Sequence, residues 1–329
     1  MSDFKMMMRE VGRPEVIARE DIMVPAPGRG CVLVRQRAIG LNFIDTYRRS
    51  GLYPVEVPAG LGTEAAGVVE AVGTGVLDFI PGDRVAYATG PVDAYATARV
   101  IGAEHLLLLP KGVDDETAAA GTLKGMTACF LVEECGKVRA GQTVLVLAAA
   151  GGVGSILVQW LAQIGAVVIA HAGSAEKAER AKALGAAHAL SCPLGELAAA
   201  VRDITGGRGV DCIFDGVGAD SWRASLASVA RRGLLITYGN ASGPVPPFDA
   251  LALMRAGSIF VTRPTLGDYA ATAEERRALA ARLYERIARK GLIIPIGQRF
   301  PLDQAAEAHR RLEARTTHGS TVLTVGNAG

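Results

Sequence analysis

Short apolar runs alternate with helical stretches in the second part of the chain. From about residue 142 onward, each run is rich in β-branched residues, and each helical stretch is roughly 10 to 14 residues long. Such alternation is typical of repeated strand–helix units in a parallel sheet, so we predict an α/β fold. The runs are VLVLAA (144–149), AVVIAHA (166–172), HALSC (188–192), VDCIFDGVG (210–218), GLLITYG (233–239) and SIFVTRP (258–264).

The first 125 residues have a different pattern, in which short strands are separated by Pro and Gly turns. The clearest strands are CVLVRQRAI (31–39), GVVEAV (67–72) and RVAYAT (84–89). After Pro264 the pattern predicts a long amphipathic helix over ATAEERRALAARLYERIARK, a strand near IGQRF, a helix over DQAAEAHRRLEA and a last strand, STVLTV. We expect this last part to return antiparallel into the β-rich domain. The predicted domains are therefore 1–125 with 265–329, and 126–264.

Composition removes several classes of protein. With 329 residues, the chain is long enough for two domains. Its apolar fraction of 50% excludes a disordered chain, and its net charge of +2 makes nucleic acid an improbable partner. The five cysteines form no CxxC pair, and the five histidines are dispersed, so we expect neither disulfides nor a metal site.

No segment of the chain is expected to be a targeting or membrane element. The amino-terminal Met run is interrupted by charged residues and lacks the apolar stretch of a signal peptide, which favours a cytoplasmic protein. The stretch 140–175 contains no Asp, Glu, Lys or Arg. Its glycines divide it into a strand, a turn, a helix and another strand, each too short to cross a bilayer of roughly 30 Å.

The strongest local motif is AAAGGVG (148–154), which follows the first apolar run and opens a helix. Gly151 would let the backbone approach a pyrophosphate, and Gly154 would let helix and strand pack closely. The positive end of the helix would face the phosphates. The usual first glycine is replaced by Ala149, but six strands are the complement of a Rossmann sheet. We therefore predict a six-stranded doubly wound sheet that binds a dinucleotide.

The tip of the second predicted strand bears on the choice of cofactor. An NAD site usually has an acidic residue there, about 20 residues past the glycines, to hold the ribose hydroxyls. Here the strand ends as IAHAG (169–173), without a carboxylate, and Lys177 follows. The tip could therefore accept the additional phosphate of NADPH.

Seven segments in order resemble the zinc-independent quinone oxidoreductases, or ζ-crystallin-like enzymes, of the medium-chain dehydrogenase/reductase superfamily. The resemblance covers nearly the whole chain and implies a GroES-like catalytic domain beside the Rossmann domain, NADPH as cofactor and a homodimer. The segments are AIGLNFIDTYRRSGLYP (38–54), GLGTEAAGVVEAVG (60–73), LKGMTA (123–128), AAAGGVGSILVQWLA (148–162), GSAEKA (173–178), YGNASG (238–243) and VTRP (261–264).

The zinc-using relatives of this family carry a Cys where this chain has Asn42 and a His where it has Thr63. They also carry a four-Cys lobe that should lie near residues 85–110, a stretch without Cys here. Glu64 by itself is a poor zinc ligand. We therefore expect direct hydride transfer to an acceptor that is already electrophilic, such as a quinone or an activated enone.

The resemblance also assigns candidate site residues. Asn42, Tyr47, Tyr53 and Thr63 match the cleft beside the nicotinamide, where the tyrosines could form a flat wall and Asn42 could donate to a carbonyl. In the family a tyrosine often lies near the adenosine phosphate, but this chain has Cys192 there, which leaves Lys177 and Arg315. Besides Gly151 and Gly154, the resemblance implies cofactor contacts at Phe43, Ile44, Asp45, Thr46, Tyr47, Thr127, Gly152, Val153, Gly173, Ser174, Lys177, Tyr238, Gly239, Asn240, Ala241, Arg263 and Arg315.

The sequence thus predicts an NADPH-dependent quinone reductase that reacts in the cleft between its domains. Two alternatives stay open: an alkenal or enone double-bond reductase, and a non-enzymatic role, since ζ-crystallin relatives serve as lens proteins and some bind AU-rich RNA. The physiological acceptor, the proton donor and the number of electrons transferred in one step are not readable from the residues.

Overall fold

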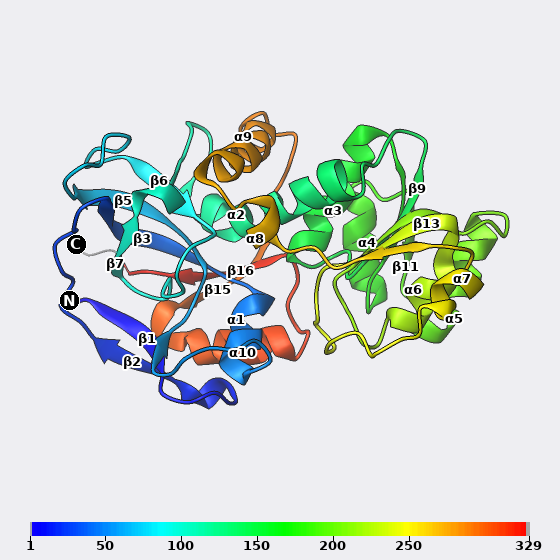
Figure 1. Cartoon of the computed structure of the whole chain (residues 1–329), viewed down its shortest axis with the longest axis horizontal. Helices are drawn as coiled ribbons and strands as arrows, with labels where there is room; N and C mark the ends of the chain where they lie inside the picture. Colours follow the sequence, from blue (N-terminus) through cyan, green and yellow to red (C-terminus); the bar gives the residue numbers. More distant parts are fainter. Residues whose placement is uncertain (1, 327–329) are drawn as a thin grey trace. The chain divides into compact units, whose positions relative to one another are not determined.

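The computed structural model describes residues 2–326 and divides into two compact units. The terminal unit comprises Met1–Met126 and Ala270–Gly329, and the central unit comprises Thr127–Tyr269. Figure 1 shows the strands and helices of each unit. The sequence placed the corresponding changes of pattern near residues 125 and 265.

The central unit contains a six-stranded parallel sheet in the order β11-β10-β9-β12-β13-β14, which confirms the predicted doubly wound sheet. The order reverses between β9 and β12. Because right-handed crossovers run in opposite directions from that point, α3 and α4 cover one face, and α5 and α6 cover the other. The strands are β9 (Thr143–Leu147), β10 (Val167–His171), β11 (His188–Leu190), β12 (Val210–Asp215), β13 (Val229–Thr237) and β14 (Phe260–Thr262). The helices are α3 (Gly152–Ile164), α4 (Ala175–Ala183), α5 (Leu194–Ile204), α6 (Trp222–Ser228), α7 (Leu251–Arg255) and α8 (Leu266–Tyr269).

The apolar stretch 140–175 folds as the sequence predicts, into β9, a turn, α3 and β10. The side chains of Leu145, Leu147 and Ile169 are fully buried in the core of the central unit, which explains the lack of charge. Among residues 2–326, no helix has both the length and the apolar character needed to span a membrane.

The terminal unit contains a seven-stranded sheet and a smaller three-stranded sheet. The central strand β3 (Cys31–Leu41) pairs antiparallel with β5 (Glu64–Val72), β7 (Ala98–Gly102) and β16 (Ser320–Thr324). The pairing of β16 with β3 confirms the predicted antiparallel return of the chain. The other strands of the larger sheet are β6 (Arg84–Tyr87), β8 (Leu107–Leu108) and β15 (Ile296–Pro301), and the smaller sheet contains β1 (Phe4–Met8), β2 (Ile17–Asp21) and β4 (Ala59–Gly60).

Four helices accompany these sheets. The predicted helices near the carboxyl end are present as α9 (Ala273–Ala288) and α10 (Ala305–Glu313). The helices α1 (Phe43–Ser50) and α2 (Asp115–Phe130) were not predicted with bounds from the sequence. Along the chain, α2 begins in the terminal unit and ends in the central unit. The amino-terminal Met run, unassigned from sequence, forms β1 because Met6 and Met8 alternate into the core.

Candidate functional site

The glycine-rich turn joins β9 to α3 in the central unit. Ala148 has a left-handed backbone with φ of 51°, and Gly151 has an extended backbone and immediately precedes the first residue of α3. A Cβ atom at Gly154 would lie 2.3 Å from the carbonyl oxygen of Ala148, so only glycine lets the helix approach the strand this closely. Gly152 and Val153 lie in the first turn of α3, whose N–H groups have no partners within the helix. The turn has the form of an anion cradle.

The tip of β10 carries no carboxylate in the structure. The strand ends at His171, whose Nε2–H donates to the carbonyl oxygen of Cys192 at 2.9 Å. Burial raises the pKa of the Cys192 thiol, which keeps it uncharged at neutral pH. Ser174 caps α4 by accepting from the backbone N–H of Lys177, as its sequence position predicts. The half-buried Lys177 therefore lies in the first turn of α4, beside an acid-free strand end.

A buried carboxylate organises the loops at the same edge of the sheet. Asp215, at the end of β12, accepts hydrogen bonds from the hydroxyls of Ser221 and Ser225 and from the backbone N–H of Val217. The loop after β13 holds Tyr238, Gly239, Asn240 and Ala241. The backbone N–H of Ala241 donates to the carbonyl oxygen of Gly216, in the segment that follows β12. Arg263 directly follows β14. Because parallel strands share one carboxyl edge, the predicted residues 151–154, 173–177, 238–241 and 263 lie along it, whereas Thr127 lies in α2.

The terminal unit holds a buried ionic cluster that the sequence analysis did not identify. Glu64 is 0% exposed, and its Oε2 accepts from Asn42 Nδ2 at 2.9 Å and pairs with Lys124 Nζ at 3.3 Å. Its Oε1 accepts from the backbone N–H of Leu123 at 2.5 Å. A Cβ atom at Gly40 would lie 2.4 Å from Oε2 of Glu64, so glycine is needed there to admit the carboxylate.

This cluster changes the role expected for Asn42. The side-chain amide uses its N–H groups on Glu64 and, at 3.4 Å, on the carbonyl oxygen of Gly40. Its oxygen faces the backbone N–H of Asp45 in a capping box, so the whole side chain is engaged within the terminal unit. The signal that could have found Lys124 is its position as the single charge among the apolar and small residues 118–130.

A second buried carboxylate lies beside this cluster. Asp45 is 0% exposed and accepts hydrogen bonds from the backbone N–H of Asn42 and the hydroxyl of Thr63. The guanidinium of Arg48 donates to the same Thr63 oxygen at 2.7 Å. Burial raises the pKa of Asp45 to about 6, because desolvation of the carboxylate outweighs these bonds. The Asp45 side chain thus faces inward.

The remaining predicted residues of the terminal unit lie mostly on or next to α1. The rings of Tyr47 and Tyr53 meet edge to face with centroids 5.3 Å apart, and the Phe43 ring lies 6.0 Å from that of Tyr47. The Thr46 hydroxyl donates to the carbonyl oxygen of Phe43, and Ile44 is half-buried. The structure therefore places Asn42, Tyr47, Tyr53 and Thr63 on α1 or in the segments next to it. Arg315 lies apart from them, just after α10.

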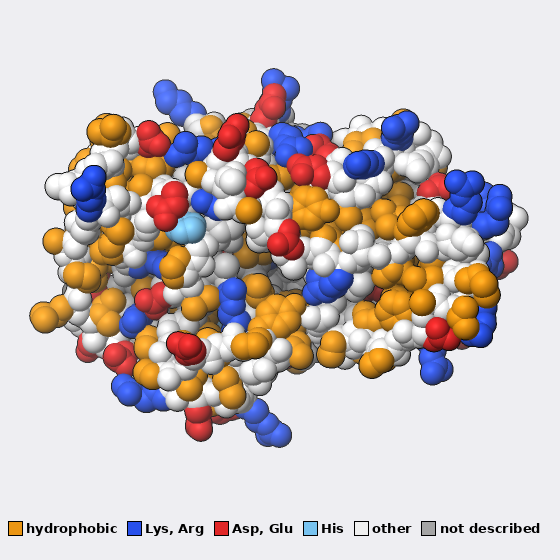
Figure 2. Space-filling model, viewed as in Figure 1, with side chains coloured by type: hydrophobic (Ala, Val, Ile, Leu, Met, Phe, Trp, Pro, Cys, Tyr) orange, Lys and Arg blue, Asp and Glu red, His pale blue; other side chains and the backbone are white. Residues whose placement is uncertain are grey.

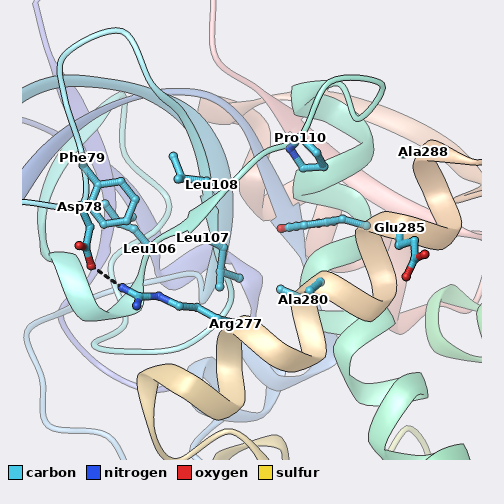
Figure 3. Close-up of a pocket in the computed structure, with 12 residues that line it drawn as sticks. Asp78, Phe79, Leu106, Leu107, Leu108, Pro110, Arg277, Ala280, Glu285 and Ala288 are labelled. Atoms are coloured by element: carbon cyan, nitrogen blue, oxygen red, sulfur yellow. Dashed lines mark hydrogen bonds and ion pairs between the residues drawn. The ribbon is translucent and has the colours of Figure 1, made fainter.

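The terminal unit also has an apolar cavity of about 660 Å³ between α9 and the segment around β8. Figure 3 shows Phe79, Leu107 and Ala280 around it, with an ion pair between Asp78 and Arg277 at 2.8 Å. None of the predicted site residues lines this cavity. This cavity is therefore separate from the site that the sequence predicts.

The geometry of the Glu64 cluster predicts the effect of removing its cation. Replacing Lys124 with Met should lower the free energy of unfolding by about 3–5 kcal/mol, because Glu64 would be left as a buried carboxylate without a countercharge. Denaturant unfolding measures the loss. The matched control is Lys111→Met, since Lys111 is exposed. Similar stabilities of the two variants would contradict the importance of the pair.

Comparison with known proteins agrees with this architecture. The family model described as "Alcohol dehydrogenase GroES-like domain" matches residues 28–161, and the model described as "Zinc-binding dehydrogenase" matches residues 152–283. Residues 2–326 nevertheless hold no group of three or more His, Cys, Asp or Glu side chains placed to bind a metal ion.

Individual relatives are more informative. A quinone oxidoreductase from Pseudomonas aeruginosa is 49% identical over 95% of this chain and 96% of its own length. A 2-haloacrylate reductase from a Burkholderia species is 41% identical over 96% of this chain and 97% of its own. The crystal structure of the Escherichia coli quinone oxidoreductase complexed with NADPH is 39% identical, with a TM-score of 0.95 over 98% of this chain and 100% of that one. The chain therefore belongs to the quinone oxidoreductases of the medium-chain dehydrogenase/reductase superfamily.

Proposed function

We propose that the protein is an NADPH:quinone oxidoreductase that works without a metal. The observation that carries this proposal is the arrangement of groups along the carboxyl edge of the central sheet. The glycine turn lies there, and so does the end of β10, which has no carboxylate and is followed by Lys177. The absence of a Cβ atom at Gly154 lets α3 begin close to the end of β9, which directs the N–H groups of its first turn to the place where a pyrophosphate would bind. Similarity to the P. aeruginosa enzyme and to the NADPH complex of the E. coli enzyme supports the same assignment.

The residues of the central unit would bind and orient the cofactor. The first turn of α3, with Gly151 and Gly154, would hold the pyrophosphate, and Lys177 would hold the phosphate on the adenosine ribose. Arg315, which belongs to the terminal unit, stays a prediction from the resemblance. The loop 238–241, Arg263 and Thr127 would position the rest of the molecule. When bound, NADPH supplies a hydride to the acceptor.

The residues around α1 would hold the acceptor. The edge-to-face pair of Tyr47 and Tyr53 offers a flat apolar wall, and Thr63 offers a hydroxyl. Glu64 is already neutralised by Lys124, so the cluster needs no metal as countercharge. An acceptor that requires no Lewis acid, such as a quinone, fits these groups.

An enone or haloacrylate double bond is the alternative acceptor. The 41% identity to a 2-haloacrylate reductase favours it, since that relative matches nearly the full chain. A role in RNA binding has less support. Lys, Arg, Asp and Glu side chains are interspersed on the face drawn in Figure 2, and a phosphate-binding surface would need a cluster of one sign. The cytoplasmic location stays a prediction.

We also propose that the protein is a homodimer joined at β14. This strand is the last in the order of the central sheet, so one of its sides has no partner strand within residues 2–326. Phe260 on β14 is 64% exposed, and Met254 on the adjacent α7 is 58% exposed. An unpaired strand bordered by apolar side chains is suited to pairing with a second copy.

Turnover assays test the function. With NADPH, the protein should reduce a panel of simple quinones, and prolonged dialysis against a chelator should leave the rate unchanged because no step uses a metal. The same assays with 2-haloacrylate and alkenals separate the two acceptor classes. Faster turnover of the enones would favour the alternative, and loss of activity together with bound zinc would refute metal independence.

Replacing Lys177 with Ala should weaken NADPH binding by roughly 10-fold or more and leave NADH binding nearly unchanged. A cation paired with a phosphate typically contributes on the order of 1.5–3 kcal/mol, and each 1.4 kcal/mol is about tenfold in affinity. Fluorescence titration of both cofactors measures the difference. The control is Lys182→Ala, an exposed lysine on the same helix. Equal losses for both cofactors would show that Lys177 supports the fold instead.

Replacing Phe260 with Lys should convert the dimer to a monomer. A buried lysine at each copy of the edge would have no partner and would repel its symmetry mate. Sedimentation velocity of wild type and variant measures the mass. Leu77→Lys provides the control, since Leu77 is 91% exposed and lies in the terminal unit. A monomeric wild type would refute the proposal.

A further inference from the structure

A chain of hydrogen bonds runs from Thr63 into the interior of the terminal unit. The Thr63 hydroxyl lies 3.0 Å from Asp45 Oδ1, and Asp45 Oδ2 lies 3.3 Å from the hydroxyl of Tyr95. That hydroxyl lies 3.1 Å from Nε2 of His309. Asp45, Tyr95 and His309 are each 0% exposed, whereas Thr63 is 6% exposed. Thr63 is therefore the one member of this hydrogen-bond network with part of its surface exposed.

The directions of these bonds are fixed by the groups at each end. Arg48 can only donate, so Thr63 accepts from it and directs its own proton toward Asp45. Burial lowers the pKa of His309 to about 3, so its ring is neutral and Nε2–H donates to Tyr95, which in turn donates to Asp45. All donors thus point toward the Asp45 carboxylate.

A proton on Asp45 would reverse one of these bonds. If Oδ1 carries the proton, it donates to Thr63, whose oxygen can accept from both Asp45 and Arg48. The Thr63 hydroxyl proton is then released from Asp45 and can point to a molecule bound beside it. The arrangement is a two-position switch for one proton.

We propose that Thr63 is the catalytic proton donor of the enzyme and that Asp45 is the buried reservoir that recharges it. This inference rests on the proposed function, because it requires a quinone bound beside Thr63. It adds the source of the proton, which hydride transfer alone leaves open.

The proposed reaction transfers a hydride from NADPH and a proton from Thr63 to the quinone. NADPH gives a hydride, that is, two electrons and one proton, to the quinone and is oxidised to NADP⁺. One quinone oxygen becomes anionic. That oxygen takes the proton of the Thr63 hydroxyl, and the O–H bond of Thr63 breaks as Thr63 takes the proton of Asp45. The products are the neutral hydroquinone and the Asp45 carboxylate. After release, Asp45 regains a proton from water through Thr63.

The surroundings of Asp45 suit a reservoir that is protonated part of the time. Desolvation raises its pKa to about 6, and the charges of Arg48 and Lys124 oppose that rise. Tyr95 faces it as a neutral phenol, since burial raises the Tyr95 pKa well above its usual value, and the charged groups Arg49 and Glu64 lie around Tyr95. With a pKa near 6, about one Asp45 in ten carries the proton at pH 7.

The test compares Thr63→Val, which removes the hydroxyl at nearly constant volume, with Thr63→Ser, which keeps it. Single-turnover oxidation of NADPH by a simple quinone is followed from pH 5 to pH 9, and NADPH affinity is titrated separately. In the wild type we expect the rate to fall as pH rises above about 6, because Asp45 then loses its proton. Thr63→Val should be slower by roughly 100-fold or more and lose this pH dependence. Thr63→Ser should keep both within a few fold, and NADPH affinity should not change in either.

Asp45→Asn provides the second measurement. An amide cannot recharge Thr63, so the fall in rate above pH 6 should disappear while quinone KM changes little. A Thr63→Val variant with the wild-type rate, or a slow one with the wild-type pH profile, would overturn the relay and leave the proposed function intact. If none of the quinones tested supports NADPH oxidation by the wild-type protein, both the relay and the proposed function are overturned.

Discussion

The buried carboxylate of Glu64 needs a countercharge, and the packing of the terminal unit is built around meeting that need. Glu64 has no access to water, and an ionised carboxylate in such a place is costly unless charge and hydrogen bonds compensate it. Its partners come from the start of α1, through Asn42, and from the middle of α2, through Leu123 and Lys124. Satisfying one side chain therefore fixes β5, α1 and α2 together. The groups proposed to bind the acceptor lie on or next to these same elements.

The central unit meets a similar need without a cation. The buried carboxylate of Asp215 is satisfied by two serine hydroxyls and by backbone N–H groups at the end of β12. Hydrogen bonds to backbone N–H groups stabilise the charged form. They also fix the course of the loop to which Ala241 is bonded, so hydrogen bonds give the loops at the carboxyl edge a defined shape.

The elements that could be predicted are those whose short stretch of sequence has a clear pattern of apolar and polar residues. The strands of the central sheet are buried on both faces, so apolar runs such as VLVLAA predict them without information from the rest of the chain. β1 was not predicted because its run of methionines shows no alternation of apolar and polar residues, although the burial of its side chains alternates in the structure. β7 was not predicted because it pairs with β3, which is far away in the sequence. The glycine turn and the acid-free tip of β10 were likewise readable from spacing. The Glu64–Lys124 pair was not, since its members are 60 positions apart in the sequence.

The position of Lys124 also bears on how far this scaffold is from its zinc-using relatives. Those relatives carry Cys and His at the positions of Asn42 and Thr63, so two substitutions would restore two of the ligands. The ammonium of Lys124 already lies 3.3 Å from Glu64, and a divalent ion placed at these positions would meet a like charge. Conversion between the two chemistries therefore requires exchanging one cation for another. Rebuilding a metal site in this chain would therefore call for a change in α2, at Lys124, as well as at the ligand positions.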